Sequence, residues 1–187
     1  MAAFFCCLVL LACEPSPSFY GDVVDPPRPA PDFALTDQYR NTFRLSDQRG
    51  KVVLLFFCYT SSTDVCPATL RAWRQVHDAL GADAAAVRFV LVTVDPRRDA
   101  PERLLEHMAL FSPDFIGLTG ELEELEPVYQ AYGVYREEIP RPGGGDGYRI
   151  SHTASVYVID PDGYWRLHHI FGTPPEEIVH DLQQLMD

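Results

Sequence analysis

The residues best suited to chemistry in this chain begin with Cys66. It stands directly before Pro67, where an apolar run at 51–58 has ended and helical periodicity begins. A helix N-terminus presents unpaired backbone N–H groups and a partial positive charge. Both favour the thiolate, which is the form that attacks electrophiles and binds soft metals. Most lone cysteines are inert and buried, but the strand–loop–helix setting favours a functional role for Cys66.

His152 is the second candidate. It follows a glycine- and proline-rich loop at 140–147 and stands where a late strand begins. If such a strand starts near the first main helix, the imidazole would lie beside Cys66. A thiolate with an imidazole suits Cu(I), and an imidazole can also activate a nucleophile as a base. The alternative is an exposed loop histidine.

The other cysteines divide into two groups. Residues 1–13 are predicted to be a signal segment, and Leu10-Leu-Ala-Cys13 resembles a bacterial lipobox whose cysteine carries lipid. Cys6 and Cys7 would leave with that segment. Only Cys58 and Cys66 then remain in the folded part, where an oxidising compartment favours a disulfide or a metal site.

Cys58 leaves two interpretations open. It stands at the end of the apolar run, where a packed strand-end residue is the ordinary interpretation. A Cys58–Cys66 bridge would need the two Cα atoms within about 7 Å. The separation of eight residues matches no standard zinc spacing.

Composition narrows the classes of partner. The net charge of −12 argues against nucleic acid, which requires a basic surface. Residues 14–31 are rich in proline and are predicted to be a tether of extended geometry. Residues 32–187 are predicted to be one domain.

The pattern of apolar residues predicts an α/β fold. An N-terminal hairpin is expected around the turn at 37–41, and a buried strand at 51–58 precedes a helix that reaches residue 80. A second strand at 87–94 completes a parallel β–α–β core. A helical insertion at 101–132, a late hairpin around Pro161-Asp-Gly163 and a final helix at 174–186 follow. This order is that of a thioredoxin-like fold.

Seven stretches together resemble the Sco/SenC family, in the family's order, over nearly all of residues 32–187. They are Asp32-Phe-Ala-Leu-Thr-Asp-Gln38, Gly50-Lys-Val-Val-Leu-Leu-Phe-Phe57, Tyr59-Thr60, Asp64-Val-Cys-Pro67, Val94-Asp-Pro-Arg-Arg-Asp-Ala-Pro-Glu102, Phe115-Ile-Gly-Leu-Thr-Gly120 and His152-Thr-Ala154. The resemblance implies a membrane-anchored copper protein of thioredoxin-like fold. It also implies assistance in assembling the copper site of cytochrome c oxidase, by copper transfer or by thiol–disulfide reduction.

One departure from the family pattern concerns the metal ligands. The family's site is a Cys-x-x-x-Cys motif plus a distant histidine. Cys66 and His152 match two of these positions, but Ser62 stands in place of the first cysteine. A serine hydroxyl is a hard and poor ligand for Cu(I). The resemblance therefore implies copper, as Cu(I) or Cu(II), on a reduced set of Cys66 and His152.

Lesser candidates are interpreted structurally. Asp64 is expected to cap the helix, and Asp95 and Asp99 are expected to hold their loop by local hydrogen bonds. His168 and His169 are expected at the surface rather than as ligands, because adjacent strand residues point to opposite faces.

Three functional hypotheses follow. The first is an assembly factor rather than an enzyme, anchored in the bacterial envelope through lipidated Cys13 and facing the periplasm or the exterior. Its partner would be the copper-carrying subunit of cytochrome c oxidase, or another copper chaperone. The second is a thiol peroxidase using Cys66, because Thr63 and Cys66 have peroxiredoxin-like spacing. The third is a non-catalytic interaction domain.

Overall fold

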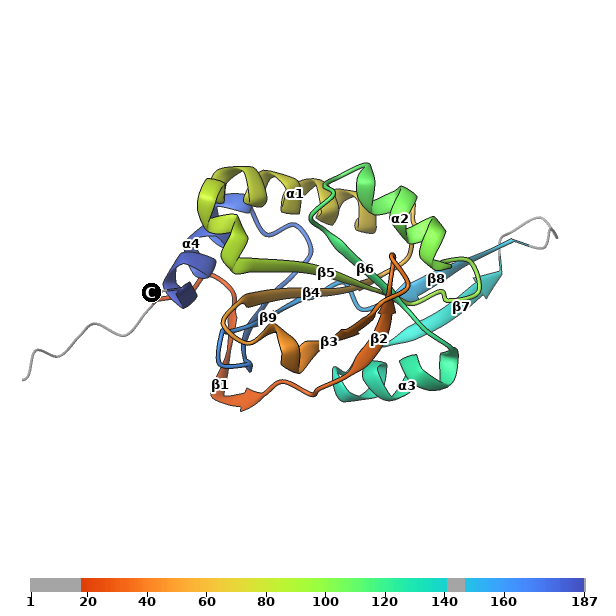
Figure 1. The fold of residues 1–187 in the computed structure, drawn as a ribbon, viewed down its shortest axis with the longest axis horizontal. Helices are drawn as coiled ribbons and strands as arrows, with labels where there is room; N and C mark the ends of the chain where they lie inside the picture. Colours follow the sequence, from red (N-terminus) through yellow and green to blue (C-terminus); the bar gives the residue numbers. More distant parts are fainter. Residues whose placement is uncertain (1–17, 141–146, 187) are drawn as a thin grey trace, which may run out of the picture.

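A computed structural model describes residues 18–140 and 147–186 of the chain. The fold is α/β (Figure 1), and the described residues form ten strands, four α-helices and two short 3-10 helices. The strands are β1 (Asp22–Pro29), β2 (Ala34–Asp37), β3 (Thr42–Arg44), β4 (Val52–Cys58), β5 (Val87–Thr93), β6 (Ile116–Thr119), β7 (Arg136–Pro140), β8 (Tyr148–His152), β9 (Val156–Ile159) and β10 (Tyr164–His169). The helices are η1 (Leu45–Gln48), α1 (Val65–Leu80), η2 (Gly81–Ala86), α2 (Pro101–Ala109), α3 (Leu122–Ala131) and α4 (Pro175–Met186).

Eight strands form one sheet in the order β1-β10-β9-β4-β5-β6-β2-β3, and β7 pairs with β8 in a separate ribbon. The pairs β4–β5 and β5–β6 are parallel, and β9 and β10 add antiparallel strands. The predicted parallel core, N-terminal hairpin, helical insertion and late hairpin are all present. Figure 1 shows α1 and α2 on one side of the sheet and α3 on the other.

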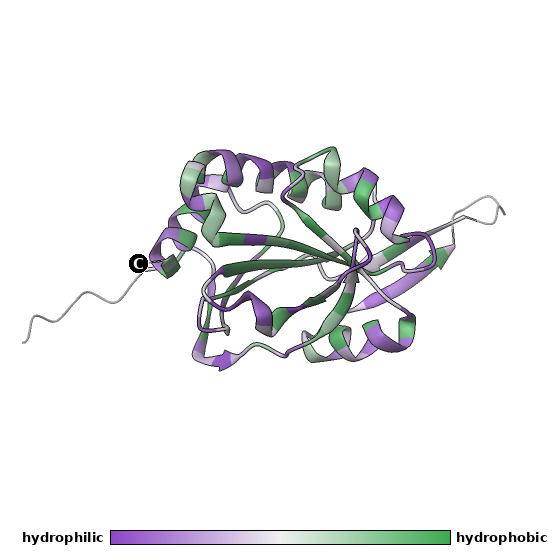
Figure 2. Cartoon of the chain, in the orientation of Figure 1, coloured by the Kyte–Doolittle hydropathy of each residue, from purple (hydrophilic) through white to green (hydrophobic). Residues whose placement is uncertain are grey.

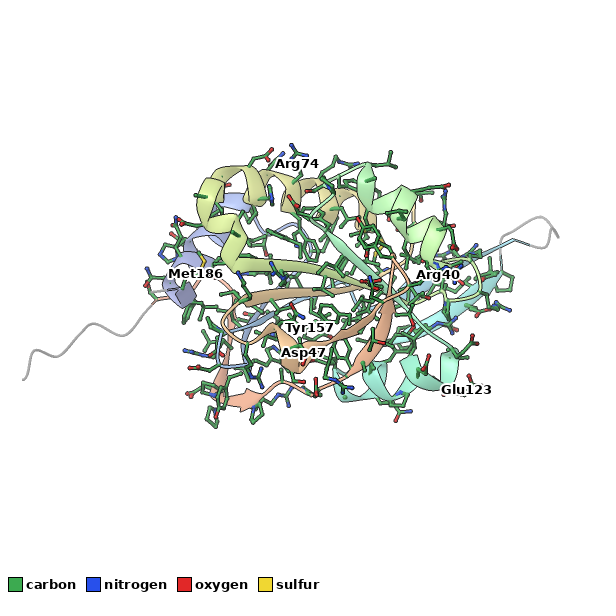
Figure 3. All side chains as sticks on the ribbon, viewed as in Figure 1. Arg40, Asp47, Arg74, Glu123, Tyr157 and Met186 are labelled. Atoms are coloured by element: carbon green, nitrogen blue, oxygen red, sulfur yellow. A yellow bond between two sulfur atoms is a disulfide. The ribbon has the colours of Figure 1, made fainter. Side chains whose placement is uncertain are left out.

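Strand β4 forms the centre of the core. All seven of its residues are buried, as expected for a strand that is covered on both faces. In Figure 2, β4 and β5 are hydrophobic along most of their length, whereas the helices alternate in character. Figure 3 places Arg74 and Glu123 on the outside of α1 and α3, and Tyr157 in the interior. The central strands are thus held rigidly, and β4 ends at Cys58.

Helix α1 begins as the sequence predicts. Asp64 is its N-cap and its side chain accepts a hydrogen bond from the backbone N–H of Val65. Pro67 lies in the first turn, where a missing N–H costs little. Residues Cys66, Leu70, Trp73, Val76 and Leu80 are buried at helical spacing, so one face of α1 packs on the sheet.

The N-terminal part of the fold differs from the predicted tether. Residues 22–29 form strand β1, which pairs with β10 at the edge of the sheet. An edge strand tolerates proline because one row of its N–H groups has no partner strand. The register shifts between Val23 and Arg28, where Pro26 and Pro27 lie, and Arg28 stacks 4.1 Å above the Trp165 ring. The predicted signal segment at 1–13 lies outside the described residues.

Within the two described ranges, no helix combines the length and the apolar character that crossing a membrane requires.

Candidate metal centre

Three potential ligands converge where β4 ends and α1 begins. Cys58 is the last residue of β4, Cys66 is the second residue of α1, and His152 is the last residue of β8. Their sulfur and nitrogen atoms all lie within 4.8 Å of one another. Among the residues that the structure describes, this is the one group of three or more His, Cys, Asp or Glu side chains with such a geometry.

The two cysteines form a disulfide, with Cα atoms 6.0 Å apart. That separation falls in the ordinary range for a disulfide. The bridge, which the sequence left open, is therefore present, and Cys58 is more than a packed strand-end residue. The signal for it was the presence of a second cysteine at a strand end, and its meaning depended on how the loop at 59–64 folds back.

His152 faces both sulfurs through one ring nitrogen. Its Nε2 lies 3.8 Å from the Sγ of Cys58 and 3.8 Å from the Sγ of Cys66. Its Nδ1 lies 2.9 Å from the carbonyl oxygen of Thr153, which can only accept a hydrogen bond. Nδ1 therefore carries the proton, and the lone pair of Nε2 points to the sulfurs. This orientation is typical of metal-binding histidines.

Burial favours the neutral form of the His152 imidazole. It lowers the pKa of His152, outweighing the hydrogen bond to Thr153 and the charge of Asp64, which both raise that pKa. A histidine must lose its second ring proton before Nε2 can bind a metal. The lowered pKa thus favours the form that is competent to bind.

Two anchors hold the loop between the cysteines. The carboxylate of Asp99 accepts hydrogen bonds from the backbone N–H of Thr60 at 3.0 Å and from the Thr60 hydroxyl at 2.6 Å. Asp99 also accepts a bond of 2.6 Å from the hydroxyl of Thr93 on β5. Burial raises the pKa of Asp99, although these hydrogen bonds oppose the shift. Sequence reasoning predicted local bonds here, but not a bond across to the cysteine loop.

Tyr59 is the second anchor. Its hydroxyl accepts a hydrogen bond of 3.2 Å from the backbone N–H of Ile150 on β8. Its ring meets that of His152 edge-to-face, with centroids 5.8 Å apart. The residue next to Cys58 thereby ties the end of β4 to the strand that carries His152, which fixes the distance between ligands.

A cavity of about 500 Å³ opens beside the site. Residues 61–65, Tyr59, Ile150 and His152 contribute to its wall. Ser62 lies in this wall and is half-buried, while Cys58 and Cys66 have no exposed surface. Of the three potential ligands, His152 is the one that faces the cavity.

The structure places His168 and His169 differently from each other. His168 is partly exposed and lies 3.5 Å from the carboxylate of Asp22. His169 is only 1% exposed, so its prediction as a surface residue is wrong. The reason is that α4 covers this face of β10, and the Nε2 of His169 lies 3.5 Å from Asp181 on that helix.

Comparison with known proteins identifies relatives over most of the chain. The sequence model of the SCO1/SenC family matches residues 23–187. A SCO2-like protein of Rickettsia felis is 30% identical over 152 residues, which cover 81% of this chain and 74% of that protein.

Two solved structures share the fold. Copper-bound ScoI of Bradyrhizobium japonicum has a TM-score of 0.77 and 34% identity, covering 83% of this chain and 98% of its own. Apo Sco1 of Thermus thermophilus has a TM-score of 0.80 and 35% identity, covering 90% and 97% respectively. The fold is thus thioredoxin-like, as the sequence predicts.

Proposed function

Because the chain belongs to the SCO1/SenC family, we propose that it binds copper and assists assembly of the copper site of cytochrome c oxidase. Cys66 and His152 are the proposed ligands. The observation that carries the proposal is the Nε2 of His152, which lies 3.8 Å from the Cys66 sulfur with its lone pair directed at it. The copper-bound relative of similar fold supports the choice of metal.

The chemical softness of the two ligand atoms also favours copper. A thiolate is a soft ligand and an imidazole is a borderline one, and this combination favours Cu(I) over hard cations. Copper is cargo in this proposal: Cys66 and His152 hold it until a partner with stronger or more numerous ligands takes it. The proposed partner is the copper-carrying oxidase subunit, or another copper chaperone.

Binding requires reduction of the disulfide first. Breaking the Cys58–Cys66 bond takes two electrons and two protons, and a dithiol donor supplies them as it closes its own disulfide. The Cys66 thiol then loses its proton on binding the metal, so binding competes with protons at low pH.

An anaerobic titration tests the proposal. The parent is the full chain with Cys6, Cys7 and Cys13 replaced by serine, so that only the thiols of the folded part remain. After reduction it should bind about one Cu(I) in competition with a Cu(I) chelator, as a site built from one set of soft ligands would. Cys66→Ala and His152→Ala should both weaken binding. Equal binding by the parent and both variants would refute the copper function.

The thiol peroxidase hypothesis gains no support from a specific contact. Within residues 18–140 and 147–186, the Cys66 sulfur is bonded to Cys58 and its hydrogen-bonding neighbour is His152 rather than an arginine. Cys66-dependent consumption of peroxide by the reduced protein would reopen it.

We propose further that residues 1–13 are a signal segment whose Cys13 is lipidated, so that the domain is tethered to the membrane of a bacterial envelope. The support is the sequence Leu10-Leu-Ala-Cys13. Labelling with a fatty-acid analogue in a bacterial host, with Cys13→Ala as the control, tests this anchor. Equal labelling of both proteins would refute it.

A further inference from the structure

The second thiol of the site stands at an unexpected position in the chain. The sequence places a serine, Ser62, where the family resemblance calls for the first cysteine. The sulfur that meets Cys66 instead comes from Cys58, four residues earlier and on a strand rather than in the loop. The two positions differ in rigidity and in exposure.

Rigidity favours Cys58. It is the last residue of β4 and pairs with Thr93 of β5, and its carbonyl accepts a hydrogen bond of 2.8 Å from the N–H of Val94. Ser62, by contrast, lies in the loop, where its N–H donates to the carbonyl of Tyr59 at 3.2 Å. A ligand held by the sheet loses little conformational freedom when it binds a metal.

Exposure separates the two positions more sharply. Ser62 lies in the wall of the 500 Å³ cavity, so a thiol there would face an incoming protein. Cys58 and Cys66 have no exposed surface and lie outside that wall. Thiol–disulfide exchange needs direct attack of a thiolate on one of the two sulfurs. A thiol held on another protein therefore has no open path to this disulfide.

We propose that Cys58 supplies the second thiol of the copper site in place of a cysteine at position 62. In this buried position the Cys58–Cys66 pair is shielded from attack by thiols of other proteins, and His152 is the ligand that a partner can reach. This inference rests on the proposed copper function. Cu(I) then binds to Cys58, Cys66 and His152, and it enters and leaves at the His152 side. The site carries copper, and it exchanges disulfides with a protein partner only slowly.

The redox step is balanced by a small donor. A dithiol reaches the buried sulfurs when the loop at 59–64 moves, and a small dithiol needs a smaller movement than a dithiol held on a protein. The attack of the small dithiol on the Cys58–Cys66 bond gives two protein thiols and the oxidised, cyclic donor. That loop is held by the bonds from Thr60 to Asp99, which oppose its opening.

A swap of the two positions tests the proposal. The variants are Cys58→Ser, Cys58→Gly with Ser62→Cys, and Ser62→Ala as the matched control, all in the parent that lacks the three N-terminal cysteines. Reduced Cys58→Ser should bind Cu(I) at least about tenfold more weakly, since a soft ligand is lost. The swap should restore affinity to within about threefold, because a second thiol returns to the same motif.

Rates of disulfide reduction test whether the Cys58–Cys66 pair is shielded from protein thiols. The ratio of the rate with thioredoxin to the rate with dithiothreitol should rise at least about tenfold in the swap, since both attack by the same chemistry and differ in access. Differential alkylation with peptide mapping follows the cysteines individually. Circular dichroism and urea unfolding report whether each variant is folded, and Cys58→Ala replaces Cys58→Ser if the latter is not.

The outcomes separate the two proposals. Copper binding by Cys58→Ser equal to that of the parent would remove Cys58 from the ligand set and leave the copper function intact. An equal rate ratio in parent and swap would show that the dithiol is open. Absence of copper binding in the parent would refute the copper function and the ligand role together, while the rate ratio would still decide whether the pair is shielded.

Discussion

The half-buried His152 and the buried His169 both have imidazoles largely withdrawn from water, but the atoms beside the two rings differ in chemistry. His152 lies beside two sulfurs, and His169 lies beside the carboxylate of Asp181. Burial lowers the pKa of both imidazoles. A lowered histidine pKa therefore does not by itself distinguish the proposed copper ligand, His152, from His169; the softness of the neighbouring atoms does.

The surroundings of His169 form a structural clasp, defined here as Tyr20, Gly21, His169, His180 and Asp181. The Asp181 carboxylate is fully buried and accepts hydrogen bonds from the N–H groups of Tyr20 at 3.0 Å and Gly21 at 2.8 Å. The Nδ1 of His180 lies 3.0 Å from the same carboxylate. The clasp joins the start of the described chain to α4. Its carboxylate oxygens are hard donor atoms, and they accept backbone hydrogen bonds.

The largest expected effect is the loss of Cu(I) affinity when a sulfur beside His152 is removed. In the reduced parent, Cys66→Ala should lower the Cu(I) affinity by at least about a hundredfold, because loss of supporting groups alone often costs 10–100-fold. Competition with a Cu(I) chelator measures it. The control is Asp181→Asn, which should bind copper like the parent. If Asp181→Asn lost copper as strongly as Cys66→Ala, the two regions would not be chemically distinct.

The second largest expected effect is a loss of stability when the carboxylate of the clasp is removed. Asp181→Asn should lower the free energy of unfolding by about 2 kcal/mol, because it removes a buried charge that accepts backbone hydrogen bonds. Urea unfolding measures the loss, and exposed Asp83→Asn is the matched control. A loss no greater than that of Asp83→Asn would mean that the clasp contributes little to stability.

A smaller effect concerns pH. Because the folded state lowers the pKa of His169 below its usual 6.5, the unfolded chain takes up the proton first as the pH falls. Stability should therefore decrease as the pH drops through and below that value, although Asp181 and Asp22 oppose the shift and His168 adds to it. His169→Gln should flatten this decrease relative to the parent, as measured by urea unfolding at several pH values.

His168→Gln is the comparison for that experiment and should flatten the decrease less than His169→Gln does. His168 is partly exposed, pairs with Asp22 at the surface, and is a lesser cause of the pKa shift of His169 than burial. An unchanged pH dependence in His169→Gln would show that another group, and not the clasp, is responsible.

The smallest expected effect is at Ser62. Ser62→Ala should change the Cu(I) affinity by less than about twofold, because a hydroxyl is too hard to bind Cu(I) well. The chelator competition applied to the reduced parent measures it. A marked loss of affinity would make Ser62 a ligand or the support of one, and would weaken the contrast between soft and hard neighbours.

Much of the fold was predictable from the sequence because its signals are local. The apolar run of β4, the periodicity of α1 and the Asp-Gly turn between β9 and β10 each specify their own element. Strand β1 was not predicted, because a proline-rich extended segment has the same local sequence pattern whether it is a tether or an edge strand. Only pairing with β10 decides between the two. Burial of His169 likewise depended on where α4 packs.

For the site, the sequence by itself determined the candidates, and the tertiary structure decided their partners. Cys66 at a helix start follows from local pattern, and His152 as a candidate follows from local pattern and from the family resemblance. The sequence predicted His152 where a strand begins, whereas it is the last residue of β8. The bond from Cys66 to Cys58, and the direction of Nε2 toward both sulfurs, required the loop at 59–64 to fold back and β8 to lie against Tyr59. Distances between residues far apart in the chain are fixed by packing, and no local pattern encodes them.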